Sequence, residues 1–85
     1  MVEYKLEITP ECRANFRNIP QKYHKPIKAA IQEIREVPQE GKPLEREMKG
    51  RHAWHVSVYR IIYKVYPRDK KIVILSVKHR GIAYN

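Results

Sequence analysis

Four residues towards the C-terminal end carry side chains that could act together on a phosphodiester. Arg60 lies among aromatic and β-branched residues, and His79, Arg80 and Tyr84 follow near the end of the chain. An arginine fork matches phosphate oxygens and can stabilise the charge that develops in a transition state. Histidine transfers protons near neutral pH, and a tyrosine can do so if neighbouring cations lower its pKa. These side chains predict metal-free phosphoryl chemistry on RNA, in which the substrate's own 2′-OH attacks the adjacent phosphate.

Other chemistries lack the residues that they need. The sequence contains no HxxxH or CxxC motif, no glycine-rich phosphate loop and no acid–His–nucleophile set at plausible positions. Cys12 is the only cysteine, so an intrachain disulfide is excluded, and we expect it to be a small packed residue. We therefore expect neither a metal ion nor another cofactor.

The charge of the chain points to a polyanionic partner. Eighteen Lys and Arg residues against nine Asp and Glu give a formal net charge of +9. Such a field favours nucleic acid, an acidic protein segment or an anionic membrane surface. A chain of 85 residues supports one hydrophobic core, which predicts a single domain spanning residues 1–85. Without a signal peptide or an apolar run of roughly 20 residues, we expect a soluble cytoplasmic protein that does not act at a membrane.

The elements that must position these side chains can be read from periodicity. Residues 2–8 alternate apolar and charged side chains, which predicts a half-buried strand. Thr9-Pro10 is a helix start for a first helix to about residue 18, and apolar residues at three- and four-residue spacing predict a second helix ending at Val37-Pro38. Residues 38–50 are expected to form a loop, and residues 54–84 a three-stranded meander with a polar tail.

Period-two alternation assigns the faces of the meander. The side chains expected to pack on the helices are Trp54, Val56, Val58, Ile61, Tyr63, Val65, Val73, Leu75 and Val77. The opposite face is expected to carry His55, Ser57, Arg60, Ile62, Lys64, Ile74, Ser76, Lys78 and Arg80. A cationic sheet face suits a phosphodiester backbone, so His55, Ser57, Lys64 and Lys78 are candidate RNA-binding residues. The alternative interpretation is an ordinary solvated face of an antiparallel sheet.

The element order, together with "MKG", "YRIIY" and the terminal "SVKHRGIAY", resembles the RelE/ParE superfamily of toxin–antitoxin toxins over essentially the whole chain. It is more similar to the RelE branch, whose members cut mRNA in the ribosomal A site, than to the ParE branch, whose members poison DNA gyrase. The resemblance implies that Arg60 contacts the scissile phosphate and that Arg80 is a second catalytic arginine. It likewise implies that Tyr84 stacks on the substrate or helps to deprotonate it, and that His79 is the histidine of the tail motif.

The resemblance also implies a fold, an activity and partners. The fold would be α+β in the order β-α-α-β-β-β, a small, mainly antiparallel twisted sheet with two helices on one face. The activity would be that of a ribosome-dependent mRNA endoribonuclease, an mRNA interferase that inhibits translation. The partners would be a cognate acidic antitoxin and a ribosome with mRNA in its A site, and the free toxin would be monomeric. Many RelE-like chains carry two basic residues where this chain has His55 and Ser57, and Lys49, Arg51 or His52 could compensate.

Two other functions stay open at this point. The chain could be a non-enzymatic inhibitor of an enzyme such as DNA gyrase, or a basic RNA-binding module without catalysis. The tail "HRGIAY" favours the nuclease, because a module that only binds RNA needs charge but has no evident need for His79 and Tyr84 beside it.

Overall fold

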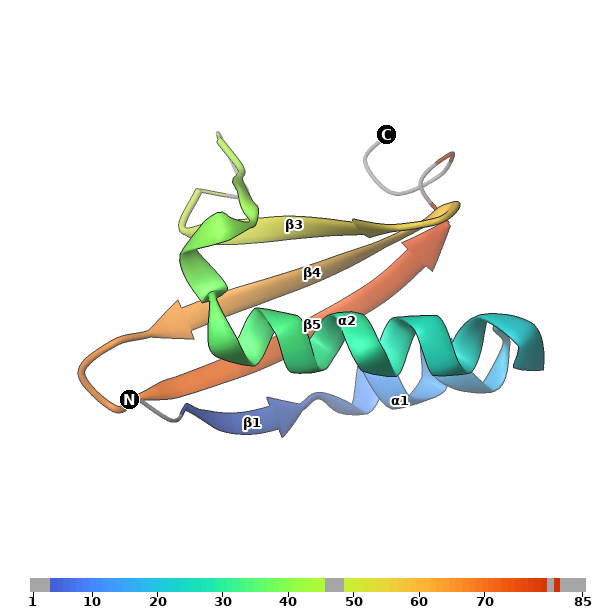
Figure 1. Ribbon diagram of the computed structural model, residues 1–85, viewed down its shortest axis with the longest axis horizontal. Coiled ribbons are helices and arrows are strands. Elements are labelled where there is room, and N and C mark those ends of the chain that lie inside the picture. Colours follow the sequence, from blue (N-terminus) through green and yellow to red (C-terminus); the bar gives the residue numbers. More distant parts are fainter. Residues whose placement is uncertain (1–3, 46–48, 80, 82–85) are drawn as a thin grey trace.

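The computed structural model describes residues 4–45, 49–79 and 81, which form one α+β unit (Figure 1). The elements in chain order are β1 (Lys5–Ile8), α1 (Pro10–Arg17), the 3₁₀ turn η1 (Gln21–Tyr23), α2 (His24–Glu36), the 3₁₀ turn η2 (Pro38–Glu40), β2 (Lys42–Pro43), β3 (Arg51–Val56), β4 (Tyr59–Tyr66) and β5 (Lys71–His79). The predicted β-α-α-β-β-β order is confirmed. No helix in the described ranges is long and apolar enough to cross a lipid bilayer.

The strands form one sheet in the order β1-β5-β4-β3-β2. β1 runs parallel to β5, and all other neighbours are antiparallel, so the predicted meander of β3, β4 and β5 forms the centre of the sheet. Strand β2 was not predicted from the sequence. It has only two residues, one of them a proline, and lies within the segment that we expected to be a loop.

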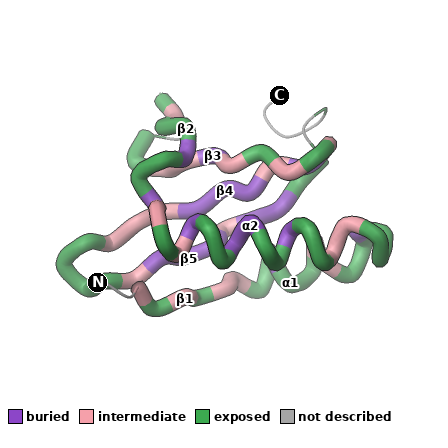
Figure 2. The backbone as a smooth tube through the Cα atoms, in the orientation of Figure 1, coloured by how far each residue is buried: buried purple, intermediate pink, exposed green. Residues whose placement is uncertain are grey.

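The helices cover one face of this sheet, and the core lies between the two layers (Figures 1 and 2). The buried residues of α2 are Ile27, Ala30, Ile31 and Ile34, which recur at three- and four-residue spacing as predicted. They join one apolar cluster with the inward residues of β4 and β5. Because both helices lie on this face, the other face of the sheet has no helix over it in the described part of the chain.

Helix α1 lies along the edge of β5 beyond the end of β1. Thr9 caps the helix, since its Oγ1 accepts a hydrogen bond from the Cys12 amide (3.1 Å) and donates one to the Leu75 carbonyl (2.8 Å). Oδ1 of Asn15 accepts a hydrogen bond from the Val77 amide (3.0 Å). Side chains of the helix thus satisfy backbone groups at an edge of β5 that β1 does not reach.

A β-bulge corrects our assignment of faces in β5. The β4–β5 register shifts between Ile62, which pairs with Ser76, and Tyr63, which pairs with Ile74. Leu75 is the extra residue, so alternation is interrupted there. The core therefore takes Ile72 and Ile74, and our expectation that Val73 and Leu75 point inwards was wrong. After the bulge the prediction holds: the core takes Val77, while Ser76 and Lys78 occupy the open face.

Tyr63 ties the segment after α2 to the sheet. Its hydroxyl donates a buried hydrogen bond of 2.7 Å to the Pro38 carbonyl. A Cβ atom at Gly41 would collide with that same hydroxyl, so only glycine fits there. His52, opposite Tyr63 on β3, stacks on its ring with centroids 5.3 Å apart. These contacts hold η2 and β2 against β3.

Candidate functional site: a cationic sheet face

The face of the sheet that lies away from the helices carries a row of basic side chains, which we call the cationic face. Strand pairing places Arg51, His55, Arg60, Lys64 and Lys78 on it. Between them lies an uncharged floor that is nearly inaccessible to solvent, made of Ala53 (4% exposed), Ile62 (3%), Ser76 (8%) and Val73 (9%). The predicted placement on one face is confirmed for His55, Arg60, Lys64 and Lys78, and the structure adds Arg51 to them.

Arg60 lies at one end of the cationic face, on the middle one of its three main strands. It lies on β4, with His55 of β3 directly opposite on one side and Lys78 of β5 on the other. Its Nε atom is buried, although the residue as a whole is half-buried. The base of the guanidinium is therefore enclosed, which limits its motion. A fork held in this way can present its terminal nitrogens to a phosphate in a fixed orientation.

Lys78, a basic neighbour of Arg60, has a carboxylate partner. Its Nζ lies 3.2 Å from Oε2 of Glu11, in the first turn of α1. Both side chains remain substantially exposed, at 44% and 59%. The ion pair restrains the ammonium beside Arg60 and offsets part of the positive charge at this end of the cationic face.

His79 lies on the face opposite to Arg60. Its strand partner is Tyr59, whose ring packs in the core, and the two ring centroids lie 5.6 Å apart with the planes at 72°. Tyr59 in turn contacts Tyr23 edge-on at 5.1 Å. Nδ1 of His79 accepts a hydrogen bond of 3.2 Å from the Gly81 amide. The structure therefore does not place His79 beside Arg60, but at the exposed end of β5, on the helix side.

The other predicted site residues fall in three places. Ser57 lies in the two-residue β3–β4 turn rather than on a strand, with φ of 56°. That turn does not need glycine, because the positive φ falls on a small polar residue that tolerates it. Lys49 is exposed just before β3. Arg80 and Tyr84 lie outside the described residues.

Comparison with known proteins shows to which family the chain belongs. Residues 6–84 match the family described as the ParE toxin of the type II toxin–antitoxin system, parDE. The chain is also 31% identical over 87 residues to Toxin RelG of Mycobacterium tuberculosis, covering 95% of each chain. The chain belongs to the RelE/ParE superfamily of type II toxins.

Solved structures place the toxin in the same fold. A chain of the RelBE2 toxin–antitoxin complex of Mycobacterium tuberculosis superposes with a TM-score of 0.74 at 31% identity, covering 95% of both chains. The isolated RelE toxin of E. coli gives a TM-score of 0.78 at 19% identity, covering 95% of this chain and 88% of that one. At such low identity the second match speaks for the fold only, and it agrees with the first.

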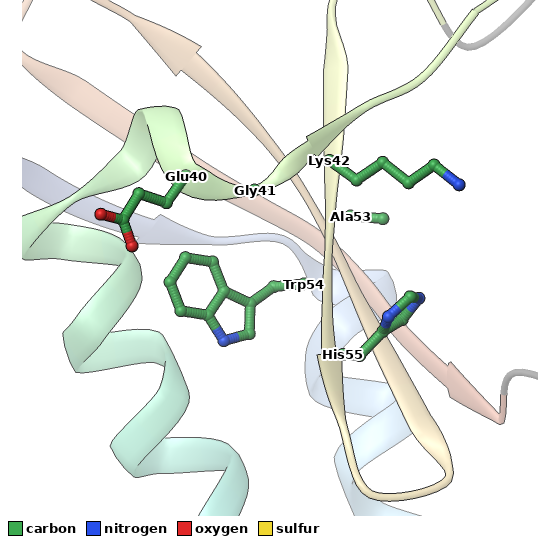
Figure 3. A pocket seen from close by; sticks show the side chains of 6 residues that line it. All are labelled: Glu40, Gly41, Lys42, Ala53, Trp54 and His55. Carbon is green, nitrogen blue, oxygen red and sulfur yellow. The ribbon is translucent and has the colours of Figure 1, made fainter.

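Three further residues of the toxin lie on the same side of the sheet as the cationic face and were not selected from the sequence as site residues. Lys42 of β2 pairs with Ala53 and projects to the same side as Ala53 and His55, whereas Trp54 points the other way (Figure 3). Tyr66 and Lys71 face each other at the far end of β4 and β5. Tyr66 could have been found by extending the alternation of Arg60 and Lys64 by two residues, but nothing in the sequence gave the register of β5.

The hollow shown in Figure 3 lies at the margin of the cationic face. It measures about 350 Å³ and is lined by Glu40, Gly41, Lys42, Ala53, Trp54 and His55. It opens where β2 ends and the edge of β3 continues. No three His, Cys, Asp or Glu side chains of the described part of the toxin gather so that they could hold a metal ion.

Two groups in the core of the toxin have raised pKa values. Burial, and secondarily the negative charge of Glu11, raises the pKa of the Cys12 thiol to about 11. Burial likewise raises the pKa of Tyr63 to about 12, against a smaller opposing effect of the Gly41 backbone. The thiol is therefore protonated at neutral pH, which confirms Cys12 as a packed residue rather than a nucleophile.

Proposed function

We propose that this toxin is a ribosome-dependent mRNA endoribonuclease that needs no metal ion. The observation that carries the proposal is the position of Arg60 at the end of the cationic face, where its Nε is buried and its strand neighbours are basic, an arrangement that would suit a phosphate. The likeness of the sequence to the RelE branch supports cleavage of mRNA in the ribosomal A site. We place this activity in the cytoplasm, with the free toxin as a monomer.

In the proposed reaction the 2′-oxygen of a nucleotide bonds to the adjacent phosphorus and the bond from phosphorus to the 5′-oxygen breaks. The products are a 2′,3′-cyclic phosphate and a 5′-OH end. Arg60 would hold the non-bridging oxygens and stabilise the charge that grows on them in the transition state. Lys78 and His55, on either side of it, would add positive charge or bind the neighbouring phosphates. Arg80 would be the second arginine on the scissile phosphate.

His79 and Tyr84 would transfer the protons. Because Nδ1 of His79 accepts the Gly81 amide, the neutral imidazole carries its proton on Nε2. To act as the general acid the ring must be the imidazolium: once Nδ1 has taken up a proton and released the Gly81 amide, Nε2 would donate its proton to the departing 5′-oxygen, which leaves removal of the 2′-OH proton to Tyr84 as the tyrosinate. We place the scissile bond at the end of the sheet, where RNA can contact Arg60 on one face and His79 round the end of β5. Lys49, Arg51 and Lys64 would bind flanking phosphates.

An acidic antitoxin would inhibit the toxin by covering this surface. Solved relatives include a RelBE2 toxin–antitoxin complex and an archaeal RelE–RelB complex. A segment rich in Asp and Glu would match the cations of the face and compete directly with RNA for Arg60.

The test is inducible expression followed by mapping of 5′ ends in cellular mRNA. We expect 5′-OH ends inside translated frames and none in untranslated RNA. Arg60→Ala should lower the frequency of these cuts by about 10²–10³-fold, the usual effect of removing one transition-state donor. Arg60→Lys should restore little, because the fork is lost while the charge is kept. Arg17→Ala, which removes an exposed arginine from α1, is the matched control and should cut normally.

The match to the ParE family favours inhibition of DNA gyrase as the second candidate. It predicts growth arrest with a DNA-damage response and without new 5′-OH ends in mRNA. Cuts that persist in Arg60→Ala would contradict the proposed catalytic role of this residue, and arrest without cuts would move the toxin to the gyrase class.

A further inference from the structure

The end of the cationic face opposite to Arg60 carries an aromatic side chain between two lysines. Tyr66 is the last residue of β4, and its ring lies on the same face as Arg60 and Lys64. Nζ of Lys64 lies 5.3 Å from the ring centroid, and Nζ of Lys71, from the opposing residue of β5, lies 5.4 Å from it. A partly exposed aromatic surface and two ammonium groups thus meet at one place.

Tyr66 differs from the other tyrosines of the described ranges. Tyr59 and Tyr63 belong to the apolar core, and Tyr4 and Tyr23 pack against it. Within the residues that the structure describes, only Tyr66 belongs to neither group, since it points away from the helices. Packing of the fold therefore does not account for an aromatic ring at this position.

We propose that Tyr66, Lys64 and Lys71 form a subsite that stacks one base of single-stranded RNA and holds the phosphates beside it. The inference rests on the proposed function in that the RNA is the same mRNA that is cut near Arg60. Every base has a π-face that can stack on a tyrosine, so such a subsite binds without reading sequence. On binding, the ammonium groups would exchange their contacts with the ring for ion pairs with phosphates.

The two ends of the cationic face are connected by a surface that RNA can follow. Arg60 and Tyr66 are six residues apart on one strand, or about 20 Å, which spans a few nucleotides. The floor between them, formed by Ile62, Ser76 and Val73, carries no charge. Beyond Tyr66 the β4–β5 turn borders a hollow of about 470 Å³ lined by Val65, Tyr66, Pro67, Arg68 and Asp69.

Carboxylates near the subsite neutralise its cations to different extents, so the cations should contribute unequally to phosphate binding. Oε2 of Glu7 lies 3.8 Å from Nζ of Lys71, so this lysine is partly neutralised. Asp69 lies in the turn beside Arg68 and lines the same hollow. Lys64 should therefore contribute more to phosphate binding than Lys71, and Arg68 less than its charge alone suggests.

The proposal is tested by the binding of short fluorescein-labelled oligouridylate to the full chain, followed by fluorescence anisotropy. The RNA carries 2′-O-methyl groups so that it cannot be cut. Tyr66→Leu keeps an apolar side chain but removes the ring, and should weaken binding about tenfold, whereas Tyr66→Phe should bind nearly as the wild type. Lys64→Ala should weaken binding and flatten its dependence on salt.

Lys22 provides the matched control for charge. Its Nζ lies 5.3 Å from the ring of Tyr23 on the helix side of the protein, so Lys22→Ala removes an equivalent lysine–tyrosine contact elsewhere. We expect Lys22→Ala to bind RNA as the wild type does. An equal loss in Lys22→Ala and Lys64→Ala would overturn the subsite, because it would mean that the RNA responds only to net charge.

A scan of the RNA needs no protein variant. One abasic nucleotide is moved along an oligouridylate that is only just long enough to reach from Arg60 to Tyr66, so that the RNA cannot slide to avoid it. One position should weaken wild-type binding about as much as Tyr66→Leu does, and should weaken Tyr66→Leu no further. Equal binding at all positions would overturn the proposal, as would a Tyr66→Leu variant that binds RNA normally but loses an acidic antitoxin peptide. RNA binding is measured without cleavage, so failure of the nuclease proposal and failure of this one are distinguished.

Discussion

The buried hydroxyl of Tyr63 leads to a stability prediction that reverses with pH. The side chain is fully buried, and its hydroxyl donates to the Pro38 carbonyl at 2.7 Å. Tyr63→Phe removes the hydroxyl and leaves that carbonyl without this donor. Near neutral pH we expect the variant to be less stable by about 1–2 kcal/mol, the usual effect of losing a buried hydrogen bond.

At alkaline pH the same hydroxyl becomes a disadvantage. Burial raises the pKa of Tyr63 to about 12, whereas a tyrosine in an unfolded chain titrates near pH 10. Because the folded pKa is the higher one, its contribution is fully present below about pH 10 and is lost as the pH rises towards 12. The loss amounts to about 1.4 kcal/mol at pH 11, so wild type and Tyr63→Phe should be about equally stable there.

The assay is urea unfolding followed by the fluorescence of Trp54, the single tryptophan, which packs partly against the core. The difference in free energy of unfolding between the two chains is measured at several values between about pH 8 and pH 11. Cys12, whose pKa is also raised, is present in both chains and cancels in this difference. A difference that stays constant across the range would refute the buried titration of Tyr63.

Two further predictions concern α1. Glu11→Gln removes the carboxylate that lies 3.2 Å from Nζ of Lys78, and should strengthen the binding of single-stranded RNA about two- to fivefold at low salt. Glu33→Gln, on the exposed side of α2, is the control and should leave binding unchanged. Equal effects of the two substitutions would contradict a specific role of the ion pair. Thr9→Val removes both hydrogen bonds of the cap hydroxyl, including the 2.8 Å bond to the Leu75 carbonyl. It should lower the free energy of unfolding, measured in urea, by about 1–2 kcal/mol. Thr9→Ser keeps the hydroxyl and should be close to wild type in stability.

Much of the fold could be predicted because its signals are local. The alternation of β1, the Thr9-Pro10 helix start and the apolar stripe of α2 depend on neighbours within one or two turns of chain. The same holds for β4, where Arg60 and Lys64 were placed correctly on the open face. In a regular strand, the face on which one side chain lies determines the faces of all the others.

The parts that could not be predicted depend on partners distant in sequence. Strand β2 exists because Lys42 pairs with Ala53, and a two-residue strand has no periodicity of its own. Lys71 becomes a candidate only when the register of β5 places it opposite Tyr66. His79 was grouped with Arg60 because both lie in the C-terminal third, yet their side chains are on opposite faces.

The bulge in β5 determines which basic residue stands beside Arg60. In an unbroken strand, the pairing of Tyr63 with Ile74 would continue to Arg60 opposite Val77, and Lys78 would point towards the helices. Val77 would then lose its place in the core. The extra residue restores Val77 to the core and brings Lys78 to the cationic face, so that packing and charge are satisfied by one irregularity.

The start of α1 fixes where that irregularity falls. The Thr9 amide donates to the Ile74 carbonyl (3.2 Å), and its hydroxyl donates to the carbonyl of the bulged Leu75 (2.8 Å). Both bonds bind the backbone at the point where the alternation changes. Since the bulge puts Lys78 beside Arg60, a helix cap on the edge of the sheet also helps to set the charge at the proposed phosphate site. The chemistry proposed for the open face would therefore depend on a contact that no residue of that face makes.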